Sequence, residues 1–167
     1  TISQLSIGDA LAVATLKKNK INKKNFKNFH PSGNLGAQLK TVEDVMLIKE
    51  KIPFINEDST MKNALRIISL KKLGTLIVIN KKGKTSGIIT DGQIRRVSQK
   101  HGSLHNLKVK TVMTKNPIRV NKGTLASKAL SIMNDNKITS LCVNSIANKN
   151  KTIGIVHIHN ILQNDMS

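Results

Sequence analysis

The sequence has no tryptophan or tyrosine, and aromatic residues make up only 2% of its 167 positions. A packed core must therefore be built from aliphatic side chains, for which a hydrophobic content of 38% is sufficient. The single cysteine, Cys142, excludes a disulfide within the chain and indicates a reducing compartment. Because Cys142 lies in an apolar run with no base beside it, we interpret it as a small core residue and not as a nucleophile.

Long apolar runs are also missing, so no segment is suited to span a membrane. No signal peptide is visible either. We therefore predict a cytoplasmic protein with no membrane partner.

Acidic residues are scarce, because 9 Asp and Glu stand against 28 Lys and Arg, and the formal net charge is +19. Such a charge raises nucleic acid as a partner. The lysines are spread through every segment, however, and no aromatic residues alternate with them for base stacking. We interpret them as a solvated surface that attracts anions in general, and we predict no specific nucleic-acid partner. Binding to nucleic acid through charge alone, with a steep salt dependence, stays open as an alternative.

The sequence repeats itself. The pattern Val-x-x-Val-Met occurs at residues 42–46 and again at 109–113, and the Gly-Ile of 87–88 returns at 154–155. The aliphatic positions between these motifs correspond at a nearly constant offset, and each copy is about 55 to 60 residues long. The chain is therefore expected to hold two similar modules.

Each copy predicts the order strand, helix, strand, strand, helix. The helices show apolar residues on one face, and the strands are rich in β-branched residues. Residues 59–60 and 123–124 can cap the first helix of each copy. The expected elements are 52–55, 61–70, 76–79, 87–90 and 92–97 in the first copy, and 118–120, 125–134, 141–143, 153–157 and 159–163 in the second.

This order, repeated twice with both motifs in register, resembles the CBS domain. The resemblance implies an α/β (α+β) fold in which a tandem CBS pair packs through its sheets, with two clefts between the copies. In the family such clefts bind adenosine nucleotides through Gly-ϕ-ϕ-Thr-x-x-Asp. Here Thr90 is in place, but Gln93 stands at the Asp position, and in the second copy His157 and Asn160 replace the Thr and the Asp. Because amides accept fewer hydrogen bonds from a ribose diol than a carboxylate does, another anion or no ligand stays open.

The first motif nominates Thr90 and Asp91 as cleft residues, together with Arg95 and Arg96 just after it. Two arginines can hold a phosphate bidentately, but they can equally be surface or interface residues. Asp91 stands two positions before the place where the family has its carboxylate, so we do not assume that it substitutes.

The second motif nominates His157 and His159, which alternate at the end of an expected strand and so face one way. Two histidines do not make a zinc site, which needs three or four ligands, so we predict no metal. We expect them to give the second cleft a polar lining.

The first forty residues differ in character from the repeat. Residues 6–18 predict a helix that is apolar on nearly all sides, and which is therefore expected to be buried in a larger body. A basic amphipathic stretch at 21–29 follows, and then His-Pro-Ser-Gly-Asn-Leu-Gly at 30–36. With Gly-Asp-Ala-Leu-Ala-Val-Ala at 8–14, this segment resembles the C-terminal end of the sugar isomerase (SIS) domain of D-arabinose-5-phosphate isomerases, where a CBS pair follows. Thr-Asp-Gly at 90–92 and the His-ϕ-His of 157–159 also resemble this family.

The resemblance implies a division into a SIS remnant at 1–40 and CBS domains at 42–100 and 108–167. It implies an aldose–ketose isomerase that interconverts D-ribulose 5-phosphate and D-arabinose 5-phosphate for Kdo and lipopolysaccharide synthesis. His30 inherits an active-site role, although by itself it would suit a turn or a cap. We predict no cofactor, a homo-oligomer that is tetrameric in the full-length protein, and no activity in this chain alone, since the phosphate-binding and other catalytic residues of the family lie upstream.

Two roles stay open for the CBS pair. It can be a regulatory module whose cleft senses an anion such as a nucleotide or a nucleotide-activated sugar. It can also be a purely structural module that mediates oligomer contacts with empty clefts, which the losses at Gln93 and Asn160 favour slightly.

Overall fold

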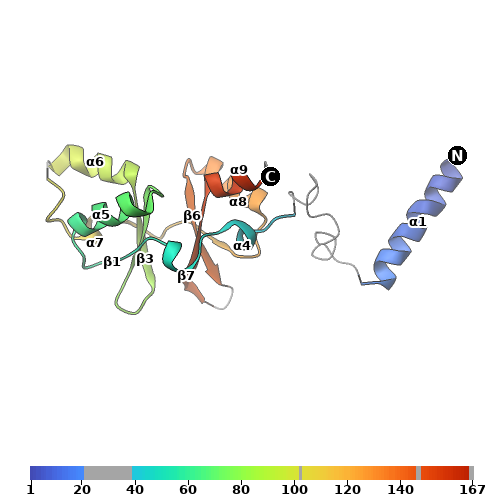
Figure 1. Ribbon diagram of the computed structural model, residues 1–167, viewed down its shortest axis with the longest axis horizontal. Helices are drawn as coiled ribbons and strands as arrows, with labels where there is room; N and C mark the ends of the chain where they lie inside the picture. Colours follow the sequence, from blue (N-terminus) through green and yellow to red (C-terminus); the bar gives the residue numbers. More distant parts are fainter. Residues whose placement is uncertain (21–38, 102, 146–147, 166–167) are drawn as a thin grey trace.

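The computed structural model describes residues 1–20, 39–101, 103–145 and 148–165. Two small α/β units carry the repeat, and helix α1 (Ile2–Lys18) lies apart from them (Figure 1). The first copy holds α4 (Val42–Val45), the 3-10 helix η1 (Lys49–Lys51), β1 (Phe54–Asn56), α5 (Met61–Lys71), β2 (Thr75–Ile79), β3 (Thr85–Thr90) and α6 (Asp91–His101). The second holds α7 (Val109–Val112), β4 (Thr114–Lys115), β5 (Arg119–Asn121), α8 (Ala126–Asp135), β6 (Ser140–Ser145), β7 (Asn148–His157) and α9 (Ile158–Asp165).

The predicted order of elements and the α/β class are confirmed. In the first copy β1 runs parallel to β2 and β3 runs antiparallel to β2, and β5, β6 and β7 repeat this arrangement in the second copy. Helix α5 buries Met61, Ala64 and Ile68 on one face, as the apolar spacing predicts, and α8 does the same at the equivalent positions. Cys142 is completely buried, which confirms its interpretation as a core residue.

Several local predictions need correction. The Val-x-x-Val motifs form the short helices α4 and α7. These helices were not predicted, because four residues are too few to show a helical periodicity. Thr60 occupies the N-cap of α5, but α8 is preceded by Leu125 and not by the expected capping residues 123–124. Helix α1 begins at Ile2, earlier than predicted, and it is exposed along its whole length, so its burial in a larger body stays a prediction.

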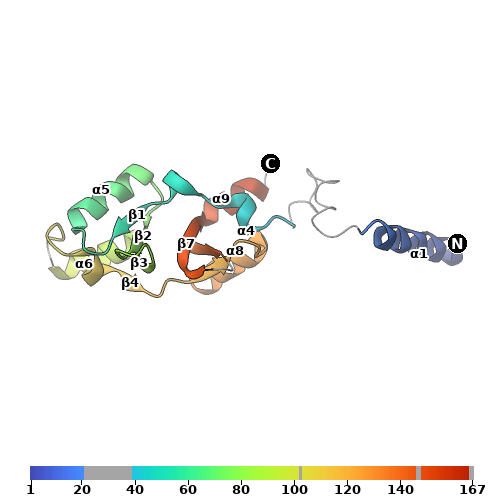
Figure 2. The ribbon, with the colours of Figure 1, turned by 90° about the horizontal axis from the view of Figure 1, so that it is seen from below.

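The opening motif of each copy packs into the core of the other copy. Val42 and Val45 of α4 pack into the core of the second unit, with Ala129 and Val156 among their neighbours. Leu47 exchanges two backbone hydrogen bonds with Ile155. The views agree in placing α4 beside α8 and α9 (Figures 1 and 2). The modules are therefore interlocked, because part of each core comes from the other repeat.

The reciprocal exchange occurs in the first unit. Val109 and Val112 of α7 join the core formed by α5, β2 and β3, and β4 pairs antiparallel with β3. The first sheet accordingly has the order β1-β2-β3-β4, and the second has β5-β6-β7. Figure 2 shows β4 alongside β3, with the chain then crossing to the second unit.

A third apolar cluster joins the two sheets, and it contains Ile52, Ile77, Cys142 and Ile155. Two buried hydroxyl pairs lie in the same junction. Thr75 and Ser140 are 3.2 Å apart, and Thr85 and Thr152 are 2.8 Å apart. The partners in each pair occupy corresponding positions of the repeat, so the junction follows a local twofold relationship. Of the described helices, none has the length and apolarity needed to cross a membrane, while the predicted compartment stays untested.

Candidate functional site

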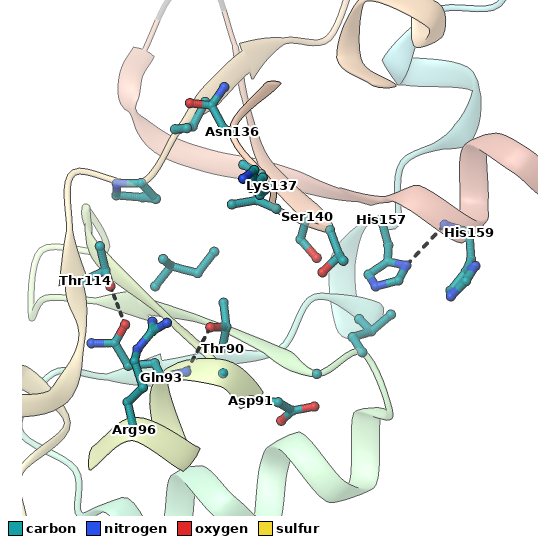
Figure 3. A pocket seen from close by; sticks show the side chains of 18 of the residues that line it. Thr90, Asp91, Gln93, Arg96, Thr114, Asn136, Lys137, Ser140, His157 and His159 are labelled. Atoms are coloured by element: carbon teal, nitrogen blue, oxygen red, sulfur yellow. Dashed lines mark hydrogen bonds between the residues drawn. The ribbon is translucent and has the colours of Figure 1, made fainter. Parts of the chain in front are cut away.

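A cleft of about 760 Å³ lies between the two units (Figure 3). Its walls come from five segments, at residues 72–74, 88–96, 114–118, 136–140 and 157–159. Both strand-to-helix junctions, where β3 meets α6 and β7 meets α9, open into it. The cleft is therefore a joint product of the two repeats.

The same backbone connection builds both junctions. The N–H of Asp91 donates to the carbonyl of Gly74 at 3.0 Å, and the N–H of Ile158 donates to the carbonyl of Thr139 at 2.9 Å. Gly74 has φ +60 and lies so close to Asp91 that an added Cβ would be 2.7 Å from Oδ2. The left-handed backbone favours glycine there, and a larger residue would also have to move the Asp91 carboxylate.

Five of the six predicted cleft residues line this cavity. They are Thr90, Asp91, Arg96, His157 and His159. In Figure 3 the Arg96 side chain extends into the cavity, whereas the Asp91 carboxylate points away from it. Arg95 is exposed and is not among the lining residues. Whether these residues bind a ligand stays a prediction.

The histidines need two corrections. They share one cleft with Thr90 and Arg96, and do not line a separate second cleft. His159 belongs to helix α9 and not to a strand, because β7 ends at His157. The rings nevertheless lie side by side, with centroids 5.0 Å apart.

Gln93 stands at the position of the family's ribose-binding Asp, and its side chain makes hydrogen bonds within the protein. Its Nε2 donates to the carbonyl of Val112 at 2.6 Å, and its Oε1 accepts from the Thr114 hydroxyl at 2.6 Å. The side chain thereby fastens the start of the second repeat to α6. Each polar atom has one protein partner, so only the second N–H and the second lone pair of the amide are left for a ribose diol.

Thr90 and His157 occupy equivalent positions and cap the helices that follow them. Thr90 Oγ1 accepts the N–H of Gln93 at 3.3 Å, and His157 Nδ1 accepts the N–H of His159 at 3.3 Å. Since Nδ1 accepts, the neutral His157 ring carries its proton on Nε2. Burial lowers the pKa of His157, and the neighbouring His159 lowers it further.

Cations dominate the charge of the cleft. Lys72, Arg96 and Lys137 line it, and Asp91 is the one carboxylate among the described lining residues. Lys72 and Lys137 were not nominated from the sequence. The repeat supplies the missed signal, because these lysines are equivalent residues at the ends of α5 and α8. The remaining candidate, His30, lies outside the described residues. Among the residues that the structure describes, no group of three or more His, Cys, Asp or Glu is placed to hold a metal ion.

The CBS domain family model matches residues 42–100 and 109–167. The chain is 38% identical over 164 residues to the arabinose 5-phosphate isomerase KdsD of Salmonella typhimurium, covering 98% of this chain and 49% of that protein. Against the KdsD of Escherichia coli K12 it is 35% identical, with the same coverage. The predicted resemblance to arabinose-5-phosphate isomerases is thus confirmed, and the chain spans about half the length of these curated relatives.

Solved structures support the fold. The CBS-domain containing protein ATU1752 of Agrobacterium tumefaciens matches with a TM-score of 0.68 and 18% identity, covering 76% of this chain and 94% of that one. CBSX2 in complex with AMP matches with a TM-score of 0.64 and 22% identity, covering 75% and 96%. With its interlocked modules, its shared cleft and these matches, the chain belongs to the CBS domain family.

Proposed function

We propose that this chain is the C-terminal part of an aldose–ketose isomerase acting on D-ribulose 5-phosphate and D-arabinose 5-phosphate, and that its CBS pair regulates the enzyme by binding an anionic metabolite. The observation that carries the proposal is the extent of the similarity to arabinose 5-phosphate isomerases. It covers 98% of the chain, so it includes residues that precede the CBS pair.

The isomerase would supply arabinose 5-phosphate for Kdo, a sugar of lipopolysaccharide. Proton transfer through an enediol needs a base, an acid and groups that hold the phosphate. His30 is the one candidate that this chain offers, and in the proposal the other groups belong to the half of the relatives that it does not cover. The 167-residue chain alone is therefore expected to be inactive. Conversion of arabinose 5-phosphate by the purified chain would contradict this expectation, with the full-length tetramer as the positive control.

The cleft supports a regulatory role. Its volume lies in the range of small-molecule sites, and its cations outnumber its single described carboxylate. A nucleotide or a nucleotide-activated sugar would fit this charge. Binding that favours one state of the catalytic domain would couple the sites by about 1–3 kcal/mol, the usual scale of allosteric effects.

Thermal melting tests whether the cleft binds such a ligand. The panel is AMP, ATP, CMP, CTP, a CMP-sugar and arabinose 5-phosphate, and a ligand at about 100 times its dissociation constant stabilises the folded state by about 2.7 kcal/mol. Arg96 and Arg95 provide a matched pair, because only Arg96 lines the cleft. The shift should shrink in Arg96→Ala and persist in Arg95→Ala. Equal shifts in both variants would place the ligand elsewhere, and the full-length enzyme should change its rate with the same ligand.

The alternative is a structural module that mediates oligomer contacts without a ligand. The specific observation in its favour is Gln93, whose two polar side-chain atoms bond to Val112 and Thr114 and so join α6 to the start of the second repeat, and are not left to a ligand alone. A stable oligomer by size-exclusion chromatography, with no thermal shift from any compound in the panel, would favour this alternative over a sensor.

A further inference from the structure

One end of the cleft carries two imidazoles with no described carboxylate bonded to either. His157 is half-buried, and its Nδ1 is occupied by the N–H of His159, which leaves Nε2–H as a donor. The ring edge opposite that bond faces the cavity in Figure 3. With ring centroids 5.0 Å apart, one anionic group can approach both rings at once.

The charged groups on the surrounding segments are mostly positive. Lys72 follows α5, Arg96 lies on α6, and Lys137 follows α8, while Asp91 at the start of α6 is directed away from Arg96. The pKa of His157 is lowered by burial and then by His159, with no carboxylate to oppose either effect. The His157 ring is therefore neutral near neutral pH while the cleft is empty, although it lies in a positive environment.

We propose that His157 and His159 form a proton-linked subsite for a dianionic group of phosphate type, so that ligand binding at this end of the cleft takes up protons. The inference rests on the proposed ligand-binding role of the CBS pair and assigns the part of the cleft that holds the anion. An anion beside the rings favours their charged form. By linkage, protonation then favours the anion to the same extent, and affinity rises as the pH falls.

The same geometry restricts the class of ligand. Residue 93 is a glutamine whose side chain is bonded to Val112 and Thr114, so that position offers no carboxylate to hold a ribose diol. The site depends instead on cations, imidazoles and hydroxyls, which recognise the charged group of a ligand. A phosphomonoester, with or without a nucleoside attached, is the class that matches these donors.

Sulfate is the sharpest probe, because its charge does not change over the range in which histidine titrates. Its dissociation constant would be measured by calorimetry on the 167-residue chain at about pH 5.5 and about pH 8, with ionic strength held equal. We expect affinity to be about tenfold higher at the lower pH, which corresponds to a rise of one unit in the pKa of one histidine upon binding. A phosphomonoester such as arabinose 5-phosphate would then be compared with sulfate.

Variants separate the subsite from helix capping. His157→Asn keeps a good N-cap for α9 but removes the titrating ring, and His159→Gln removes the second ring. Each variant should reduce the pH dependence of binding and the double variant should abolish it, whereas the control His105→Gln, at an exposed histidine outside the cleft, should preserve it. Binding that is independent of pH and unchanged in the cleft variants would overturn the subsite but leave the regulatory role intact. Binding of neither sulfate nor the phosphomonoester at either pH would overturn the subsite, and a melting panel in which no nucleotide shifts the chain either would overturn the regulatory role as well.

Discussion

The hydroxyl of Thr85 lies 2.8 Å from the hydroxyl of Thr152, its counterpart in the other repeat, and both residues are buried. Thr85 Oγ1 also accepts the backbone N–H of Thr152 at 3.2 Å. The two threonines thus provide hydrogen-bond partners for each other's buried polar groups at the centre of the junction between the sheets.

Removing these hydroxyls should have unequal effects. Thr85→Val removes the hydroxyl that bonds both the hydroxyl and the buried N–H of Thr152, so it should cost about 1–3 kcal/mol of unfolding free energy. Thr152→Val keeps the bond from that N–H to Thr85 and should cost less. Urea denaturation of both single variants and of the double variant measures the order and the coupling. A larger loss in Thr152→Val would contradict the described bonds.

Gly87 makes a close approach that a methyl group would block. A Cβ there would lie 2.7 Å from Met113 Sδ and 2.7 Å from the backbone oxygen of Thr114. Because the backbone oxygen cannot rotate away, Gly87→Ala should cost about 1–3 kcal/mol and loosen β4 from β3. Gly123 has no heavy atom within 4 Å of an added Cβ, so Gly123→Ala is the matched control. Equal melting temperatures for the two variants would count against this packing.

The thiol of Cys142 should be inert in the folded protein. Burial raises its pKa to about 11, although Thr152 and Arg119 oppose the shift. At neutral pH the thiolate is therefore a negligible fraction, and the side chain is inaccessible as well. Ellman's reagent should label no thiol in native buffer and one thiol per chain in denaturant. Rapid labelling of the native protein would show that the junction opens.

Stability should fall as the solution becomes mildly acidic. The pKa of His157 is lowered in the folded state, so below its ordinary value of about 6.5 the unfolded chain binds the proton first. Its contribution is complete above that pH and is lost as the pH falls toward the lowered value. His157→Asn should flatten this part of the curve of unfolding free energy against pH. An unchanged slope would mean that other groups cause it.

More of the fold than of the candidate site could be predicted from the sequence. Helix 61–70 and strand 76–79 were predicted within one residue of α5 and β2, because apolar spacing and β-branched residues determine them locally. Arg95 and Arg96 were indistinguishable as neighbours in sequence, and only their different directions from α6 place one of them in the cleft. The bonds of Gln93 to Val112 and Thr114 depend on a contact between repeats, which periodicity does not reveal.

Because the opening helices are exchanged, the boundaries of the sequence repeat differ from those of the folded unit: each core takes its short helix, α4 or α7, from the other repeat. The first core runs without interruption from Ile55 to Val112, and its sheet closes with β4. The second core instead needs Val42 and Val45 from the far end of the pair. A cut at the repeat boundary near residue 100 would therefore leave each half holding a helix that belongs to the other. A cut that frees residues 52–116 would release one complete unit, so the duplicated segment and the smallest separable piece of this protein are different stretches of chain.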